Sequence, residues 1–250
     1  MRLRHVVFSL LASTALLAAP GADAAPAPAT ASATASATIG QVQLALPIPS
    51  EFEPPSVTPK AYMQVFEDIQ RPTDRVMAAM LSKDYVAKVR AGDKAAEMSR
   101  FLIVKTSRRF DTEDFSQDDL TQVKALIRHP SAQLLQLQQQ LLAQAANRMT
   151  QDVVKMTGDT SATVHQGDVQ WLGVFDEQPN SIAFARLQTS GSDSKAGEEH
   201  DLQVAASAII RIHGKMLGVV VYDDFRSQAN VEWVKGVIRD FIKRVNELNP

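Results

Sequence analysis

The sequence predicts an α+β fold in which helices cover an antiparallel sheet and a long amphipathic helix ends the chain. Two patterns carry this prediction. Between residues 169 and 223, apolar and polar residues alternate in four stretches, most of them joined by short links, which is typical of an antiparallel meander. Between residues 231 and 248, apolar residues instead recur at the spacing of one helix face. We expect one or two strands from the N-terminal half to extend the sheet.

Residues 1–24 have the three parts of a secretory signal peptide. Arg2 and Arg4 give a positive start, an apolar run follows, and ADA at 22–24 supplies the small residues that signal peptidase requires. The apolar run is too short to cross a bilayer, which takes about 20 residues. The chain also has no cysteine for a lipid anchor or a disulfide. We therefore predict cleavage before Ala25 and secretion into the periplasm.

Residues 25–57 are rich in alanine, proline, serine and threonine and offer few large side chains to bury. This composition is typical of a disordered segment, so we predict a flexible tether. The remaining residues, 58–250, are enough for a single α+β domain with a substantial core.

The first half of this domain has clear helix starts. Three helices are expected to begin after a capping hydroxyl: Thr58, Ser82 and Ser116. Asp119 completes a capping box with Ser116, and the helix that follows is expected to end at His129-Pro130. A further helix is predicted over residues 131–156, packed against the sheet, with a coiled coil as the alternative.

Two strands are expected between these helices. Residues 76–81 fit a strand or a helix, and we favour a strand because Ser82 then caps the next helix. Residues 101–104, FLIV, have the β-branched and aromatic character of a strand. Residues 190–200 are polar and are expected to form a loop between two strands of the meander.

The turn of the last hairpin is predicted at His213-Gly214. A two-residue type I′ turn needs a positive φ at both positions, which glycine adopts freely and histidine tolerates. This turn pairs Ile212 with Lys215 and makes one face of both strands continuously apolar. The final helix is expected to pack on the sheet through one apolar face: Val231, Val234, Ile238, Phe241, Val245 and Leu248.

The same register gathers polar residues at the other end of the sheet. Asp223 and Asp224 are expected opposite Val204 and Gln203, with an acidic stretch one or two pairs further out. The predicted binding site comprises Glu198, Glu199, His200, Asp201, Asp223 and Asp224. Carboxylates with an imidazole suit a divalent metal. No tight ligand spacing such as HxH is present, so a metal site, a general acid–base site and a solvated acidic rim stay open as alternatives.

The remaining motifs favour binding over catalysis. The sequence has no GxSxG nucleophile motif, no cysteine, and no nucleotide, haem or flavin motif, so no catalytic residue and no cofactor is assigned. A net charge of −2 gives no field to attract nucleic acid. We expect a non-enzymatic module of the cell envelope that binds a protein partner. One specific form is an immunity or inhibitor protein that covers the active site of a toxin or hydrolase.

Two alternative functions stay open. A metal-assisted hydrolase would use the acidic and histidine cluster. A small-ligand or lipid carrier would use the second face of the sheet, which is apolar enough to need a cover. The residues expected on that face are Ala205, Ile209, Met216, Val220 and Tyr222.

The C-terminal part resembles a known layout. GKMLGVVVYDDF followed by VEWVKGVIRDFIKRVNELN is similar to exported bacterial proteins of unassigned function, and distantly to the PsbP-like α/β sandwich. The resemblance covers residues 165–250 and does not account for residues 58–157. It implies a sandwich fold and a binding role.

Overall fold

The computed structural model describes residues 33–130 apart from 69, 71, 94 and 95, and residues 163–250 apart from 195 and 196. Between residues 131 and 162 it describes only positions 140, 143, 144, 146–148, 150, 151 and 154, all of them helical. The predicted signal peptide lies outside the described residues, and so does most of the helix predicted over residues 131–156.

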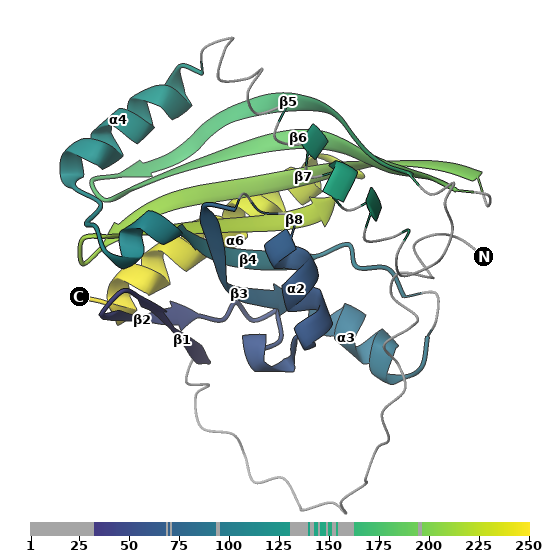
Figure 1. Cartoon of the computed structure of the whole chain (residues 1–250), viewed down its shortest axis with the longest axis horizontal. Helices are drawn as coiled ribbons and strands as arrows, with labels where there is room; N and C mark the ends of the chain where they lie inside the picture. The colour runs from purple at the N-terminus through teal and green to yellow at the C-terminus, as the bar shows by residue number, and fades with distance from the viewer. Residues whose placement is uncertain are drawn as a thin grey trace, which may run out of the picture.

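The fold is α+β, as predicted, and its centre is a six-stranded antiparallel sheet (Figure 1). In spatial order the strands are β3 (Asp74–Leu81), β4 (Phe101–Ser107), β8 (Lys215–Asp224), β7 (Gly197–Ile212), β6 (Ser181–Ser194) and β5 (Thr163–Gln178). Strands β5 to β8 are the predicted meander, and β3 and β4 are the two strands added from the N-terminal half. The strand interpretation of residues 76–81 is therefore confirmed.

Strands β6 and β7 are longer than predicted. The segment expected as a polar loop, residues 190–200, continues the ladder, with Ser190 opposite Asp201 and Ser194 opposite Gly197. The loop prediction is therefore wrong. Strand pairing uses main-chain hydrogen bonds, so a run of glycine, serine and acidic residues can extend a hairpin that its apolar part has already placed in register.

The last hairpin has the predicted turn and register. His213 has a φ of 48° and Gly214 a φ of 73°, as a type I′ turn requires. Ile212 pairs with Lys215, and Ala206 with Val221, so each strand alternates between the same two faces of the sheet.

One face of the sheet is covered by α6 (Gln228–Leu248), which runs behind the strands in Figure 1. Ser227 and Asn230 form a capping box at its start. Seven of its side chains are buried: Val231, Val234, Val237, Ile238, Phe241, Ile242 and Val245. Leu248, predicted to belong to this face, is 37% exposed because it lies in the last turn of the helix.

The hairpin of β1 (Thr34–Ile39) and β2 (Val42–Pro47) packs on the same side of the sheet, beside α6 (Figure 1). Ile39, Leu44 and Leu46 are fully buried in the core that α6 also fills. The side-chain amide of Asn249 pairs with the backbone of Ala45 in both directions, each hydrogen bond 2.9 Å long. The tether predicted over residues 25–57 is therefore wrong from Thr34 onward, where the chain belongs to the folded core.

The other face of the sheet is covered over β3 and β4 by a second, smaller cluster. It contains the 3₁₀ helix η1 (Pro55–Val57), α2 (Lys60–Asp68) and α3 (Lys83–Arg90). Ser82 caps α3 as predicted, by accepting a hydrogen bond from the Tyr85 amide. The hydroxyl of Thr58 instead donates to the Ala79 carbonyl at 2.8 Å, so it ties the start of α2 to β3.

The remaining elements lie at the turn ends of the strands. The 3₁₀ helix η2 (Arg108–Asp111) follows β4, and α4 (Gln117–Arg128) follows η2. The predicted capping box of Ser116 and Asp119 is present, and α4 ends at His129 as expected. The ammonium of Lys124 donates to the carbonyls of Gln178 and Pro179, which holds α4 at the β5–β6 turn.

Candidate functional site

The predicted acidic site has the expected backbone register. Val204 lies opposite Asp223 and Gln203 opposite Asp224. Strand β7 then continues beyond the end of β8, carrying residues 198–201 further along β6. The side chains of Glu198, Glu199, His200 and Asp201 lie outside the described residues, so their part in a site stays a prediction.

The structure gives Asp223 a role inside the fold. Its side chain is 4% exposed, and its two carboxylate oxygens accept hydrogen bonds from Arg100 Nε at 3.0 Å and Nη2 at 3.2 Å. Asn230 Nδ2 donates a third at 2.8 Å. The guanidinium of Arg100 lies 4.3 Å from the centre of the Trp233 ring. This arrangement ties β8 to the segment before β4 and to the start of α6.

Asp224 is the next residue of β8, so its side chain lies on the face of the sheet opposite that of Asp223. Its Oδ2 atom is 3.6 Å from Arg226 Nη2. Among the residues described, no group of three or more histidine, cysteine, aspartate or glutamate side chains is arranged to hold a metal ion. The side chains of residues 198–201 are not among the residues described.

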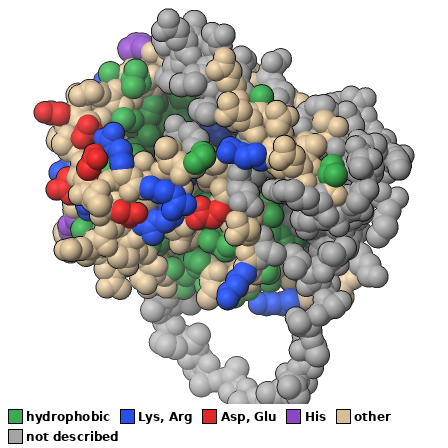
Figure 2. Space-filling model, viewed as in Figure 1, with side chains coloured by type: hydrophobic (Ala, Val, Ile, Leu, Met, Phe, Trp, Pro, Cys, Tyr) green, Lys and Arg blue, Asp and Glu red, His purple; other side chains and the backbone are tan. Residues whose placement is uncertain are grey.

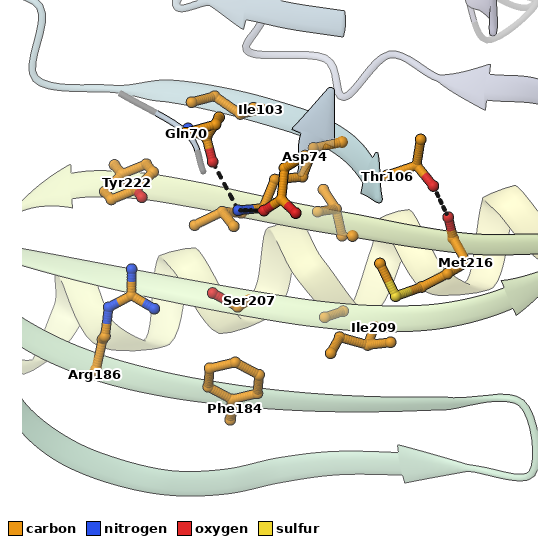
Figure 3. A pocket seen from close by; sticks show the side chains of 15 residues that line it. Gln70, Asp74, Ile103, Thr106, Phe184, Arg186, Ser207, Ile209, Met216 and Tyr222 are labelled. Atoms are coloured by element: carbon orange, nitrogen blue, oxygen red, sulfur yellow. Dashed lines mark hydrogen bonds and ion pairs between the residues drawn. The ribbon is translucent and has the colours of Figure 1, made fainter. Parts of the chain in front are cut away.

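A different feature of the molecule forms a pocket. We call the face of the six-stranded sheet opposite α6 the pocket face; Figure 2 views it and shows hydrophobic side chains recessed between charged ones. A cavity of about 220 Å³ lies there, between β3, β4 and the strands β6 to β8. Its walls are mainly apolar, with Ile103, Phe184, Ile209, Met216 and Tyr222 among the residues that line it (Figure 3).

The cavity follows from the sizes of residues that face one another across the strands. Ser207 and Gly218 lie in the middle of the pocket face, on β7 and β8. Their neighbours on the flanking strands β6 and β4 are larger: Phe184 pairs with Ser207, and Lys105 pairs with Gly218. Small residues at the centre and large ones around them leave a hollow in the middle of the sheet.

Aromatic rings stand on both sides of this hollow. On one side Phe66, Phe101 and Tyr222 stack in series, with centroid distances of 5.4 and 4.5 Å. On the other, Trp171 of β5 stacks on Phe184 of β6 at 4.9 Å. The first stack involves α2, β4 and β8 and the second involves β5 and β6, so aromatic rings lie on both sides of the pocket.

Two cationic side chains line the cavity in different environments. Lys105 Nζ lies 2.7 Å from Gln70 Oε1 and 3.5 Å from an oxygen of the buried Asp74 (Figure 3). Arg186, half-buried on β6, donates from Nε to Gln188 Oε1 at 3.1 Å. Sequence reasoning named the apolar residues of this face but missed Arg186 and Phe184. The alternation of β6 was the available signal, since residues 182, 184 and 186 share a face.

A buried pair of tyrosines lies under α2 and α3. The hydroxyls of Tyr62 and Tyr85 are 2.5 Å apart, and burial raises the pKa of both phenols. Both groups therefore stay neutral, and the pair acts as a polar link inside an apolar cluster.

Comparisons with known proteins give only distant likenesses. No protein-family model matches the sequence, and no curated protein matches it. Among solved structures, the Ran-binding protein Mog1p of Saccharomyces cerevisiae is similar at a TM-score of 0.30 and 9% identity, over 88% of this chain and 93% of that chain. A point mutant of protein Mog1 gives a TM-score of 0.30 and 11% identity, over 78% and 80% of the two chains. At this TM-score the likeness carries no argument about function.

Within the described residues, no helix combines the length and the apolar character that crossing a membrane requires.

Proposed function

We propose that this chain is a non-enzymatic binding protein that holds a protein partner on its pocket face. The observation that carries the proposal is the set of side chains around the cavity. They belong to the residue types that are enriched at protein interfaces and that dominate their binding energy. These side chains are Trp171, Phe184, Arg186, Met216 and Tyr222.

The size of the cavity favours a protein partner over a carried small molecule. Its volume of about 220 Å³ is below the roughly 300–1,000 Å³ of sites that enclose a drug-sized ligand. A cavity of this size instead suits one or two anchoring side chains that project from a partner surface. The sheet beneath it is held by pairing on both sides and by α6 behind, so the surface is preorganised and binding loses little conformational entropy.

The signal-peptide pattern at residues 1–24 supports a periplasmic location for this interaction. The specific form that we propose is an immunity or inhibitor protein, in which the pocket face covers the active site of a toxin or hydrolase. The competing hypothesis is a metal-assisted hydrolase that would use Asp223 as one of its metal ligands. Both carboxylate oxygens of Asp223 instead accept hydrogen bonds from Arg100 and Asn230, so this ligand is not available.

The proposal is tested by cross-linking from the two faces of the protein. A photoreactive p-benzoylphenylalanine is placed at Val174, which is 36% exposed and pairs with Phe184, and separately at the exposed Asp240 of α6 as the control. We expect one protein to cross-link from position 174 and not from position 240, and excess untagged chain to compete with that product.

The captured protein is then identified, purified and titrated against the wild type and Phe184→Ala. Loss of the Phe184 ring is expected to weaken binding at least tenfold, as interface anchors do, while thermal unfolding confirms that the variant is folded. Equal cross-linking from both positions, no specific product from position 174, or unchanged affinity for folded Phe184→Ala would each refute this proposal.

A further inference from the structure

Arg186 lies where a ligand in the cavity would meet it. In the register of the sheet, one row across the pocket face runs from Trp171 through Arg186 and Ala205 to Tyr222. The small side chain of Ala205 lies between Arg186 and Tyr222 in this row, and Figure 3 shows the guanidinium of Arg186 extending from its strand toward the middle of the sheet. Its planar group thus forms part of the cavity wall.

Most of the hydrogen-bonding capacity of Arg186 is unused inside the described fold. A guanidinium has five N–H donors, and the described residues accept from one of them, Nε, through Gln188. No carboxylate among the described residues lies within ion-pair distance of Arg186, whereas many other arginines of the described chain have such a partner: Arg75, Arg90, Arg100, Arg108, Arg109, Arg128, Arg226 and Arg244. A half-buried guanidinium with unused N–H donors and no carboxylate beside it is stabilised when an anionic ligand binds to it.

The other cation of the cavity is already neutralised. Lys105 faces the buried carboxylate of Asp74 at 3.5 Å. Among the described residues that line the cavity, Arg186 is then the cation that has no carboxylate at ion-pair distance. The walls around it are apolar and aromatic, so the complementary group is a carboxylate attached to an apolar body.

We propose that Arg186 binds the carboxylate of an acidic side chain of the protein partner, and that a large apolar side chain next to it enters the cavity. The inference rests on the proposed function and names the chemistry of the partner segment: an aspartate or glutamate beside an aromatic or branched aliphatic residue. The two terminal nitrogens of a guanidinium match the two oxygens of a carboxylate, and this match distinguishes arginine from lysine.

Small probes test the recognition chemistry without the partner. The purified chain is titrated with 3-phenylpropionate, with the neutral 3-phenylpropanamide and with dodecanoate, while the indole N–H signal of Trp171 is followed by NMR. We expect the phenylpropionate to bind about tenfold more tightly than the amide. Arg186→Gln should abolish that preference, and Arg239→Gln, the same change on the exposed face of α6, should preserve it. Equal affinity for acid and amide, or a preference that survives in Arg186→Gln, overturns the inference.

Two further measurements show whether the carboxylate comes from a lipid or from a side chain of the protein partner. Dodecanoate binding at least 100-fold more tightly than phenylpropionate would identify a lipid occupant and overturn the assignment to a protein segment. With the cross-linked partner in hand, Arg186→Gln should weaken its binding about tenfold, and Arg186→Lys should recover only part of the loss. A partner that is lost with Phe184→Ala but unaffected by Arg186→Gln overturns this inference and leaves the proposed function standing.

Discussion

Replacing Gly40 by alanine is expected to loosen the β1–β2 hairpin from the core. Gly40 has a φ of +59°, and a Cβ atom built on it would lie 2.2 Å from the carbonyl oxygen of Asp111. The same glycine donates its amide N–H to Asp111 Oδ1 at 3.2 Å, and Arg75 Nη2 reaches that oxygen at 2.5 Å. The substitution therefore strains the turn and displaces the backbone that holds the hairpin in place.

The expected loss is the sum of two effects. A left-handed backbone costs a residue with a Cβ about 1–2 kcal/mol, and forcing an atom into a packed site costs about 1–3 kcal/mol. We expect Gly40→Ala to lower the free energy of unfolding by about 2–5 kcal/mol, a large share of the roughly 5–15 kcal/mol that stabilises a typical domain. Urea unfolding followed by tryptophan fluorescence measures the change, because Trp233 lies on α6, beside the core that the hairpin completes.

Gly92 provides the matched control. Its φ of +77° is also left-handed, but nothing lies within 4 Å of a Cβ built on it. Gly92→Ala should therefore show only the backbone strain, about 1–2 kcal/mol. If the two variants lose the same stability, the close approach of Gly40 to Asp111 has no energetic effect and the packing of the hairpin described above is wrong.

Three other predictions follow from the same structure. Gly236→Ala, in α6 with open space around its Cα, should raise the free energy of unfolding by about 0.5–1 kcal/mol in the same urea assay; a loss of stability would contradict the open space. Arg100→Ala leaves the buried Asp223 carboxylate with Asn230 alone, and it should lower the free energy of unfolding by about 3 kcal/mol. The same substitution in an Asp223→Asn background should lower it by less. Equal losses in the two backgrounds would show that Arg100 and Asp223 are not energetically coupled. The hydrogen bonds from Ser116 lower the pKa of the Asp119 carboxyl below 3.8, so its contribution is present above that pH and is lost as the pH falls through the folded-state pKa. In the Asp119→Asn variant the urea midpoint should therefore decrease less steeply as the pH is lowered. A decrease as steep as in the wild type would contradict a stabilising role for the Ser116–Asp119 capping box.

The parts of the fold that sequence reasoning predicted are those set by local rules. The β7–β8 register follows from one glycine and from the alternation of side chains around it, because a one-residue slip would turn Ile210 and Val219 away from the core. The buried face of α6 follows from helical spacing in the same way. Each of these patterns lies within about twenty residues of sequence.

The parts that were missed depend on distant partners or on misleading composition. Alanine and threonine in β1 resemble a disordered segment, and the alternation of Leu44 and Leu46 becomes meaningful only once α6 covers them. The pocket depends on the pairing of β4 with β8 and on register shifts in the β5–β6 ladder, which place Trp171 beside Arg186. Spacing along the sequence does not reveal these neighbours, so the cavity and its arginine could be seen only in three dimensions.

The amide of Asn249 that pairs with Ala45 joins residues 204 positions apart. During synthesis on the ribosome the β1–β2 hairpin emerges early, yet α6 and Asn249, which complete its burial, are made about 200 residues later. Until then Ile39, Leu44 and Leu46 lack the apolar face of α6 that helps to bury them in the finished fold. The closing of this contact is a high-contact-order step, so we expect it among the late events of folding.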